Sequence, residues 1–304
     1  MHILQFGTDG IRGKADTFPF TNDALFKLGN ALAQWSSNKY KTKKPSVLIG
    51  HDTRVSCRRI KQSLKKGLEN LGINITDCGI LPTPAIYQII QNEKNFHFGI
   101  VISASHNHHS DNGIKILDAK TGKLDNTDED AILNLFGKAP DRTPSMSTTS
   151  TKKDAIKQWN EAPSLYQKYI TQHFNKNFLK DLTIVLDCSH GATYKTAPAI
   201  FESLGAKVIT LCVKPNGRNI NHRCGSLYPD LLKEAITQNK ADIGFAFDGD
   251  GDRVIAMNKE GQIKDGDDLL SILLTHSNYN KTQNIVGTVM TNHGFDLNLR
   301  SIGK

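Results

Sequence analysis

The feature that most limits the possible folds is an almost unbroken alternation of strand-like and helix-like segments. Short apolar runs such as Ser46–Gly50, Thr183–Asp187 and Ile243–Phe247 have the length and composition of buried strands. Between them, apolar residues recur three and four apart, as in the helix expected to begin at Thr21 or Asn22. Such alternation favours βαβ units. We therefore predict an α/β protein of consecutive βαβ-type domains with mixed, largely parallel sheets.

The remaining segments continue this alternation. Further strands are expected at Ile73–Cys78, Phe98–Ser103, Gly113–Leu117, Lys207–Cys212 and Ile285–Met290. Further helices are expected at Ile60–Leu71 (stopped by Gly72), from Pro84 through Ile90, at Leu165–Phe174, Thr193–Leu204, Pro229–Asn239 and Asp265–His276, and from Gly294.

A change in composition divides the chain. From Ala139 to Lys153 the residues are mainly Pro, Ser, Thr and Lys without apolar periodicity, which is typical of a linker. We expect one α/β domain at residues 1–140 and a second at 155–252. Residues 253–304 are expected to form a truncated third α/β domain, because one strand and two helices cannot cover a sheet. A second polypeptide that supplies the missing part is the alternative.

The bulk composition, with 38% hydrophobic and 22% charged residues, is that of a soluble globular protein. The amino terminus lacks the pattern of a signal peptide, and no apolar run approaches the roughly 20 residues that cross a bilayer. Five scattered cysteines without a Cys-x-x-Cys pair indicate reduced thiols and a cytoplasmic protein, and argue against a zinc site or a disulfide framework.

The formal net charge of +8 raises the possibility of nucleic-acid binding. Part of this charge lies in the single run Lys39–Lys44, between an expected helix and an expected strand, where a solvated loop is the better interpretation. An excess of basic residues suits phosphorylated metabolites equally well. We therefore expect neither a nucleic-acid nor a membrane partner.

The most informative motif is Phe247-Asp-Gly-Asp-Gly-Asp-Arg253, directly after a strand-like run. Because Asp248, Asp250 and Asp252 alternate with glycines, an extended backbone places their carboxylates on one side. Carboxylates this close repel one another unless a cation lies among them. Mg²⁺, which keeps open positions for a phosphate substrate, is the expected cation. An acidic surface loop is the alternative.

This motif is not a calcium EF-hand, although Asp-x-Asp-x-Asp begins one. The sixth position of an EF-hand loop is Gly and the twelfth is Glu, whereas this chain has Arg253 and Lys259 there.

A second motif, Ser103-Ala-Ser-His-Asn107, follows the expected strand that begins at Phe98. A serine in such a loop is a common nucleophile in α/β folds. The neighbours Ala104 and His106 exclude the Gly-x-Ser-x-Gly elbow of hydrolases. A simple turn satisfied by serine and asparagine is the alternative. The following Asp111–Lys115 segment, which returns to a strand, weakens that alternative.

A third motif, Phe6-Gly-Thr-Asp-Gly-Ile-Arg-Gly13, places three glycines, a threonine and an arginine in one loop. Such a loop can offer backbone N–H groups and a guanidinium to an anion, but it is no standard nucleotide motif. His106, His108 and His109 are close enough to suggest zinc. No Cys or Glu supports that assignment, and the last two are better read as surface histidines.

Together, these three motifs resemble those of the α-D-phosphohexomutases in order and spacing. Their residues are most similar to those of the bacterial phosphoglucosamine mutases. The resemblance runs from the first residues to the last. It implies that Ser105 carries a phosphoryl group, and that Asp248, Asp250 and Asp252 hold one Mg²⁺ together with that phosphoserine.

The resemblance also implies a group of residues around the reacting phosphate. Thr8, Arg12 and Arg253 are implied as phosphate- or substrate-binding residues, and Arg12, His106 and Lys115 as catalytic residues. Lys115 is a candidate for proton transfer.

The implied reaction converts glucosamine 6-phosphate to glucosamine 1-phosphate, for UDP-N-acetylglucosamine and peptidoglycan precursors. It passes through a bisphosphate, and a glucose or glucosamine 1,6-bisphosphate acts as activator. Phosphoryl transfer depends mainly on positioning and charge neutralisation, which Mg²⁺ and the basic residues can supply.

Two departures from the family pattern affect these expectations. His108 stands where the family usually has proline, which leaves the rigidity of the serine loop open. The family's Gly-Glu-x-Ser-Gly-His and Arg-x-Ser-Gly-Thr-Glu-Pro loops, which contact the sugar and its second phosphate, have no counterpart. We therefore expect weak or no sugar turnover by this chain alone. A phosphoglucomutase or phosphomannomutase, or a non-catalytic fragment, remains an alternative.

Overall fold

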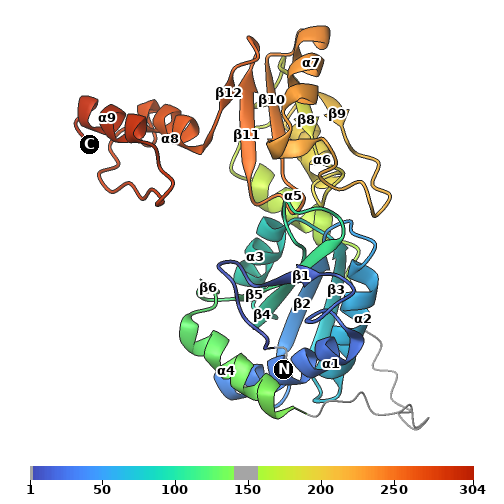
Figure 1. Ribbon diagram of the computed structural model, residues 1–304. Coiled ribbons are helices and arrows are strands. Elements are labelled where there is room, and N and C mark those ends of the chain that lie inside the picture. The colour runs from blue at the N-terminus through green and yellow to red at the C-terminus, as the bar shows by residue number, and fades with distance from the viewer. Residues whose placement is uncertain (1–2, 140–156) are drawn as a thin grey trace.

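The computed structural model describes residues 3–139 and 157–304. Two α/β lobes, each with its own sheet, lie one above the other in Figure 1. Helix α5 (Ala162–Thr171) lies at their junction and packs against a helix of each lobe. Apart from Ala139, the linker predicted at Ala139–Lys153 is outside the described residues. The α/β class is confirmed, while the domain boundaries stay predictions.

The first lobe is built on a mixed sheet with strand order β1-β5-β4-β2-β3-β7, and β6 pairs with β5. Strand β2 is parallel to β3 and β4, β3 is parallel to β7, and β5 is antiparallel to β1, β4 and β6. The strands are β1 (Ile11–Lys14), β2 (Ser46–His51), β3 (Asn74–Ile80), β4 (Phe98–Ile102), β5 (Asp111–Asp118), β6 (Gly122–Lys123) and β7 (Lys157–Gln158).

Helices cover both faces of this sheet because its central strands alternate their apolar side chains between the two faces. In β2, Val47 and Ile49 join the core under α1 (Asn22–Tyr40), α2 (Cys57–Glu69) and α4 (Asn126–Lys138). Leu48 points the other way, into the core under α3 (Thr83–Asn92) and α5.

The second lobe has a mixed sheet of order β12-β11-β10-β8-β9, with β8 parallel to both β9 and β10. Its strands are β8 (Thr183–Asp187), β9 (Lys207–Leu211), β10 (Ile243–Phe247), β11 (Val254–Asn258) and β12 (Ile263–Lys264). Helix α6 (Thr196–Ser203) covers one face and α7 (Asp230–Asn239) the other, with a 3₁₀ turn η1 (Gly225–Leu227) before α7.

Several helix ends follow the predicted chemistry. Thr21 caps α1, since its side chain accepts a hydrogen bond from the backbone N–H of Ala24. The helix expected at Ile60–Leu71 ends at Glu69 in the structure, and Leu71, which lies beyond this end, is 39% exposed. No described helix is both long and apolar enough to cross a membrane.

The C-terminal helices α8 (Gly266–Thr275) and α9 (His293–Ser301) extend to one side of the second lobe (Figure 1). The strand predicted at Ile285–Met290 is wrong, since these residues form no strand. A strand needs a neighbour for its backbone groups, and this segment pairs with no strand in the described part of the chain. Val286, Val289 and Met290 are accordingly almost fully exposed.

Candidate functional site

The site forms where loops from the two lobes meet. The loop with Ser105 follows the carboxyl end of β4, and the acidic loop with Asp248 follows the carboxyl end of β10. The Ser105 hydroxyl donates a hydrogen bond to Oδ2 of Asp248 at 2.6 Å, although 143 positions separate the two residues. Both side chains are buried. The structure thus brings the predicted serine and the first predicted metal ligand into direct contact.

Ser105 has a backbone conformation that serine rarely adopts, with φ at 54°. Its N–H donates to Oγ of Ser103 at 2.9 Å, and the Ser103 hydroxyl donates to Asp52 at 2.6 Å. A left-handed residue of this kind persists only where its surroundings fix it. The hydrogen bonds from Ser105 to Ser103 and from Ser103 to Asp52 therefore hold the loop in this conformation.

Arg54 is the main support of the serine loop, and the motifs do not reveal it. Its buried guanidinium pairs with the Asp52 carboxylate at 2.8 Å. It also donates to the backbone carbonyls of Ser105 (2.9 Å), Asn107 (2.8 Å), His108 and Asp111 (3.1 Å). The sequence signal for it is weak: an Asp-Thr-Arg run that begins two residues after the strand predicted at Ser46–Gly50.

Asn221 of the second lobe also holds the serine loop. Its side-chain amide donates to the carbonyls of Ser105 at 2.9 Å and Asn107 at 3.1 Å. Together with Arg54 it supports a loop in which His108 replaces the usual proline. Asn221 lies outside the three sequence motifs.

The acidic loop approaches the serine loop closely because two of its residues are glycines. A Cβ on Gly249 would lie 2.5 Å from the Ser105 carbonyl oxygen. A Cβ on Gly251, whose φ is +69°, would lie 2.4 Å from Thr193. Any side chain at Gly249 would thus force the two loops apart, which gives these glycines a physical role.

The three aspartates form one cluster. Asp248 and Asp250 are buried, Asp252 is exposed, and one carboxylate oxygen from each lies within 4.8 Å of the others. Thr83 of the first lobe binds Asp250 twice, through its N–H to the carbonyl oxygen (2.8 Å) and its hydroxyl to Oδ2 (2.6 Å). The other oxygen of Asp250, Oδ1, is buried without a hydrogen-bond partner among the described residues.

These residues fit a hard divalent cation. The donors are all oxygen, the Ser105 hydroxyl adjoins them, and an unpartnered buried oxygen is available at Asp250. Burial, and then the Asp250 and Asp252 charges, raise the pKa of Asp248 to about 6. The raised pKa means that ionising Asp248 beside two other carboxylates is unfavourable, so the cluster lacks positive charge.

Lys115 supplies part of that charge. Its ammonium group is 2.8 Å from Asp250, 2.7 Å from Asp252 and 2.7 Å from Asp9. Burial opposes the charged form of Lys115, but the Asp250 and Asp252 carboxylates raise its pKa above the ordinary value. Burial likewise favours neutral Asp250, yet Lys115 keeps the pKa of that carboxyl below its ordinary value.

Arg253 and His106 lie beside the serine. The Arg253 guanidinium is 2.8 Å from the Asp248 carboxylate and also donates to the Ser105 hydroxyl oxygen and to Nδ1 of His106. Burial, followed by the Arg253 and Arg12 charges, lowers the pKa of His106. His106 is therefore a neutral acceptor at neutral pH.

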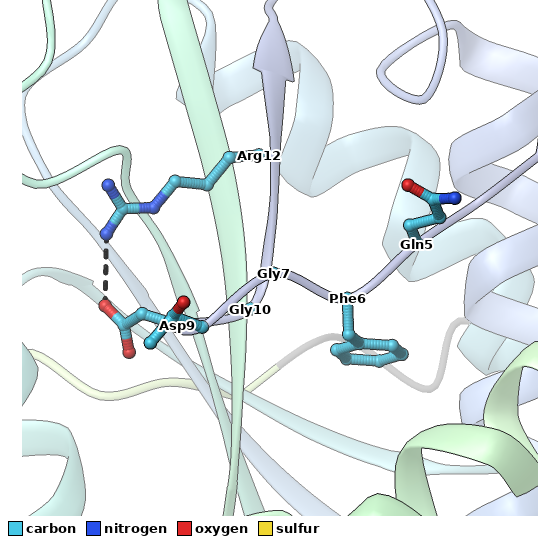
Figure 2. A pocket seen from close by; sticks show the side chains of 7 residues that line it. Gln5, Phe6, Gly7, Asp9, Gly10 and Arg12 are labelled. Atoms are coloured by element: carbon cyan, nitrogen blue, oxygen red, sulfur yellow. Dashed lines mark hydrogen bonds and ion pairs between the residues drawn. The ribbon is translucent and has the colours of Figure 1, made fainter.

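The glycine-rich loop forms a hollow of about 430 Å³, shown in Figure 2. The Arg12 side chain reaches toward Asp9 and pairs with it at 3.1 Å, and Asp9 in turn contacts Lys115. Asp9 thus links Arg12 to Lys115, a role that the motif by itself does not indicate. Thr8 lines the hollow, but in the described part of the chain it has no hydrogen bond to the acidic loop.

Family models match most of the chain. Residues 4–142 match the phosphoglucomutase/phosphomannomutase alpha/beta/alpha domain I, and residues 164–261 match domain II. A phosphoglucosamine mutase of Psychrobacter sp. is 41% identical over 98% of this chain, which spans 66% of that relative's length.

Two solved structures show the same fold. A phosphomannomutase described as putative, from Thermus thermophilus, has a TM-score of 0.77 at 20% identity, covering 93% of this chain and 63% of its own. An Aspergillus fumigatus N-acetylphosphoglucosamine mutase, in complex with GlcNAc-6P and magnesium, has a TM-score of 0.56 at 15% identity, covering 99% and 61%. The chain belongs to the phosphoglucomutase/phosphomannomutase family.

Proposed function

We propose that this chain carries the phosphoserine and metal-binding part of a phosphoglucosamine mutase site. The single observation that carries the proposal is the 2.6 Å contact between the Ser105 hydroxyl and Asp248, inside the cluster of three aspartates. The substrate is glucosamine 6-phosphate, converted to glucosamine 1-phosphate. The 41%-identical relative is a phosphoglucosamine mutase, which supports this choice over glucose and mannose phosphates.

A phosphoryl group on Ser105 would lie beside three carboxylates, so the site needs additional positive charge. Lys115 and Arg253 already contact these carboxylates. We propose that Asp248, Asp250, Asp252 and the phosphoserine hold Mg²⁺, as the magnesium complex of the fungal relative suggests. When bound, Mg²⁺ would neutralise charge on the transferring phosphoryl group.

In the first half-reaction, a hydroxyl oxygen of the sugar phosphate attacks the phosphorus of phosphoserine, and the bond from phosphorus to Oγ of Ser105 breaks. Arg253 donates to that oxygen, so positive charge already faces the leaving group. Lys115, which carries a proton at neutral pH, is the candidate for proton transfer: it would give that proton to Oγ of Ser105 and take up the proton that the attacking hydroxyl loses. The resulting bisphosphate then turns and returns its other phosphoryl group to Ser105.

The proposal concerns the exchange between Ser105 and a bisphosphate, since the chain spans 66% of its curated relative. Full turnover of the sugar phosphate is a further step of the same proposal. It requires, beyond the serine loop and the acidic loop, groups that bind the sugar and its second phosphate. That a second polypeptide supplies these groups stays a prediction.

Intact-mass measurement after incubation with Mg²⁺ and glucosamine 1,6-bisphosphate tests this exchange. The wild-type chain should gain one phosphoryl group, located on Ser105 by peptide mapping. Ser105→Ala should gain none, whereas Ser110→Ala, a matched change five positions along at a serine that hydrogen-bonds Lys14, Ala15 and His108, should gain one as the wild type does. An unmodified wild-type chain, or a phosphoryl group that persists in Ser105→Ala, contradicts the proposal.

A further inference from the structure

A second group of potential metal ligands lies in the second lobe, outside the site described above. His190, Cys212 and Cys224 each offer one ligand atom, and these three atoms lie within 4.8 Å of one another. His190 follows β8, Cys212 follows β9, and Cys224 directly precedes η1. Because β8 and β9 are parallel, their carboxyl ends deliver the first two ligands to the same edge of the sheet.

The donor set is one imidazole nitrogen and two sulfurs, which is the chemistry of zinc and not of magnesium. Zn–S bonds of about 2.3 Å and Zn–N bonds of about 2.0–2.1 Å put the ligands of a tetrahedral site roughly 3.5–3.8 Å apart. Ligand atoms that lie within 4.8 Å of one another need to move closer by at most about 1.3 Å. The three thiol and imidazole groups are thus nearly in place.

The surroundings already fix the ligand-bearing loops. The buried Asp187 carboxylate accepts hydrogen bonds from the N–H groups of Ser189 (2.8 Å) and Gly225 (2.7 Å), which adjoin His190 and Cys224. His190 and Cys212 hold left-handed backbone conformations, with φ at 51° and 53°. Such conformations in residues other than glycine cluster at functional sites.

We propose that His190, Cys212 and Cys224 bind one Zn²⁺, with the fourth position open to water. His190 must give up one weak interaction, because its Nδ1 accepts a 3.2 Å hydrogen bond from the Lys214 N–H. Zinc on Nδ1 replaces that bond directly. Zinc on Nε2 moves the ring proton to Nδ1 and also ends it. Two zinc–thiolate bonds outweigh this loss.

The position of this cluster gives zinc a structural consequence. Asn221, which holds the serine loop, lies three residues before Cys224, and its N–H donates to the Ser189 carbonyl at 2.9 Å. The His190 carbonyl accepts a hydrogen bond from Thr53 of the first lobe at 2.6 Å. Zinc would therefore tie together the loops through which the second lobe contacts the serine loop.

Titration of the reduced, metal-free chain with Co²⁺ alone tests the proposal, because cobalt gives an intense near-ultraviolet absorption only when thiolates bind it. We expect this absorption to saturate at one Co²⁺ per chain and Zn²⁺ to abolish it at one equivalent. Cys212→Ala and Cys224→Ala should each remove about half of the intensity, and each should weaken binding by more than the roughly tenfold loss that outer-shell changes already cause. His190→Gln should keep the thiolate absorption but shift the visible cobalt bands.

Two controls separate this cluster from the rest of the chain. Cys78→Ala removes a buried thiol of the first lobe, and Asp250→Asn disrupts the acidic cluster. Both should leave the thiolate–cobalt absorption unchanged. Cys212→Ser, at a half-buried position, replaces any alanine variant that loses its far-ultraviolet circular dichroism. Cobalt binding without thiolate absorption, an absorption unchanged in both cluster variants, or a Cys212–Cys224 disulfide that forms in place of metal binding would overturn the inference.

Discussion

Arg54→Met should strongly destabilise the first lobe, because it removes one partner of a fully buried ion pair. The Arg54 and Asp52 side chains are both 0% exposed. Methionine retains much of the side-chain volume and none of the charge. Asp52 would keep hydrogen bonds from the Ser103 hydroxyl and the backbone N–H at position 54, but no positive charge.

The expected loss of unfolding free energy is at least about 3–5 kcal/mol, the usual cost of leaving one charge of a buried pair alone. The carbonyls of Ser105 and Asn107 keep a donor in Asn221, and the His108 carbonyl keeps the Asp111 N–H, so among the described residues the Arg54 variant leaves only the Asp111 carbonyl without a donor. This partly buried carbonyl can gain water, so it adds less. The ion pair therefore dominates a loss that is large beside a total stability of roughly 5–15 kcal/mol.

Urea unfolding, monitored by tryptophan fluorescence, measures this loss in the first lobe. Trp35 lies in the core of the first lobe, and Trp159 stacks on Phe96 of the same lobe. The double variant Asp52→Asn/Arg54→Met should regain about 2 kcal/mol or more, because it no longer buries an unpaired charge. Arg58→Met, at an exposed position of α2 four residues along, should change stability by no more than about 0.5 kcal/mol.

Two results would refute this reasoning. One is an Arg54→Met variant within about 1 kcal/mol of the wild type, which would mean that Asp52 is not a buried, unpaired charge once Arg54 is gone. The other is a double variant no more stable than Arg54→Met. A stable double variant that no longer accepts a phosphoryl group on Ser105 would, in addition, assign the backbone contacts of Arg54 to positioning the serine.

Three further predictions concern the acidic loop. Without divalent cations, the pKa of Asp248 is about 6 in the folded chain, against an ordinary 3.8. The stability that the protonated carboxyl contributes is therefore fully present below pH 4 and is lost as the pH rises through 6. Asp248→Asn should therefore gain up to about 3 kcal/mol relative to wild type between pH 4 and 7 in urea unfolding, and Mg²⁺ at pH 7 should stabilise the wild type alone. Asp250→Asn should weaken Mn²⁺ binding at least about tenfold, or about 1.4 kcal/mol, by paramagnetic resonance titration; equal affinity would exclude this cluster as the site. Gly249→Ala should cost about 1–3 kcal/mol through overpacking and slow Ser105 phosphorylation, whereas Gly137→Ala, where a Cβ meets nothing within 4 Å, should not.

The elements predicted from sequence are those whose pattern does not depend on distant partners. Strands β2, β8 and β10 are short apolar runs buried at the centres of their sheets, and such runs are recognisable locally. Helix α4 was missed because it buries only Ile132 and Phe136, which leaves little apolar periodicity. The apolar run Ile285–Met290 has the composition of a strand but pairs with none in the described part of the chain, and local composition cannot reveal that.

The candidate site likewise contains residues that can be predicted from the sequence and residues that cannot. Ser105 and the three aspartates stand in compact motifs, so their chemistry is readable from the sequence itself. Arg54 and Asn221 act on backbone carbonyls, which every residue possesses, and no pattern of side chains shows which carbonyls will turn toward them. The cluster of His190, Cys212 and Cys224 likewise exists only once parallel strands bring their ends together.

The serine loop is held from both lobes, and this makes its geometry depend on how the lobes meet. Arg54 belongs to the same lobe as Ser105 and stays with it, whereas Asn221 and Asp248 belong to the other lobe. The described direct hydrogen bonds between lobes outside that loop include Thr53 to the His190 carbonyl, Val55 to the Gly217 carbonyl, and Thr83 to Asp250. Polar contacts of this kind exchange readily with water, unlike a large apolar interface. A small rotation of one lobe would thus carry Asp248 away from Ser105 while leaving the Arg54 contacts intact, so the 2.6 Å contact depends on how the lobes meet as much as on either loop.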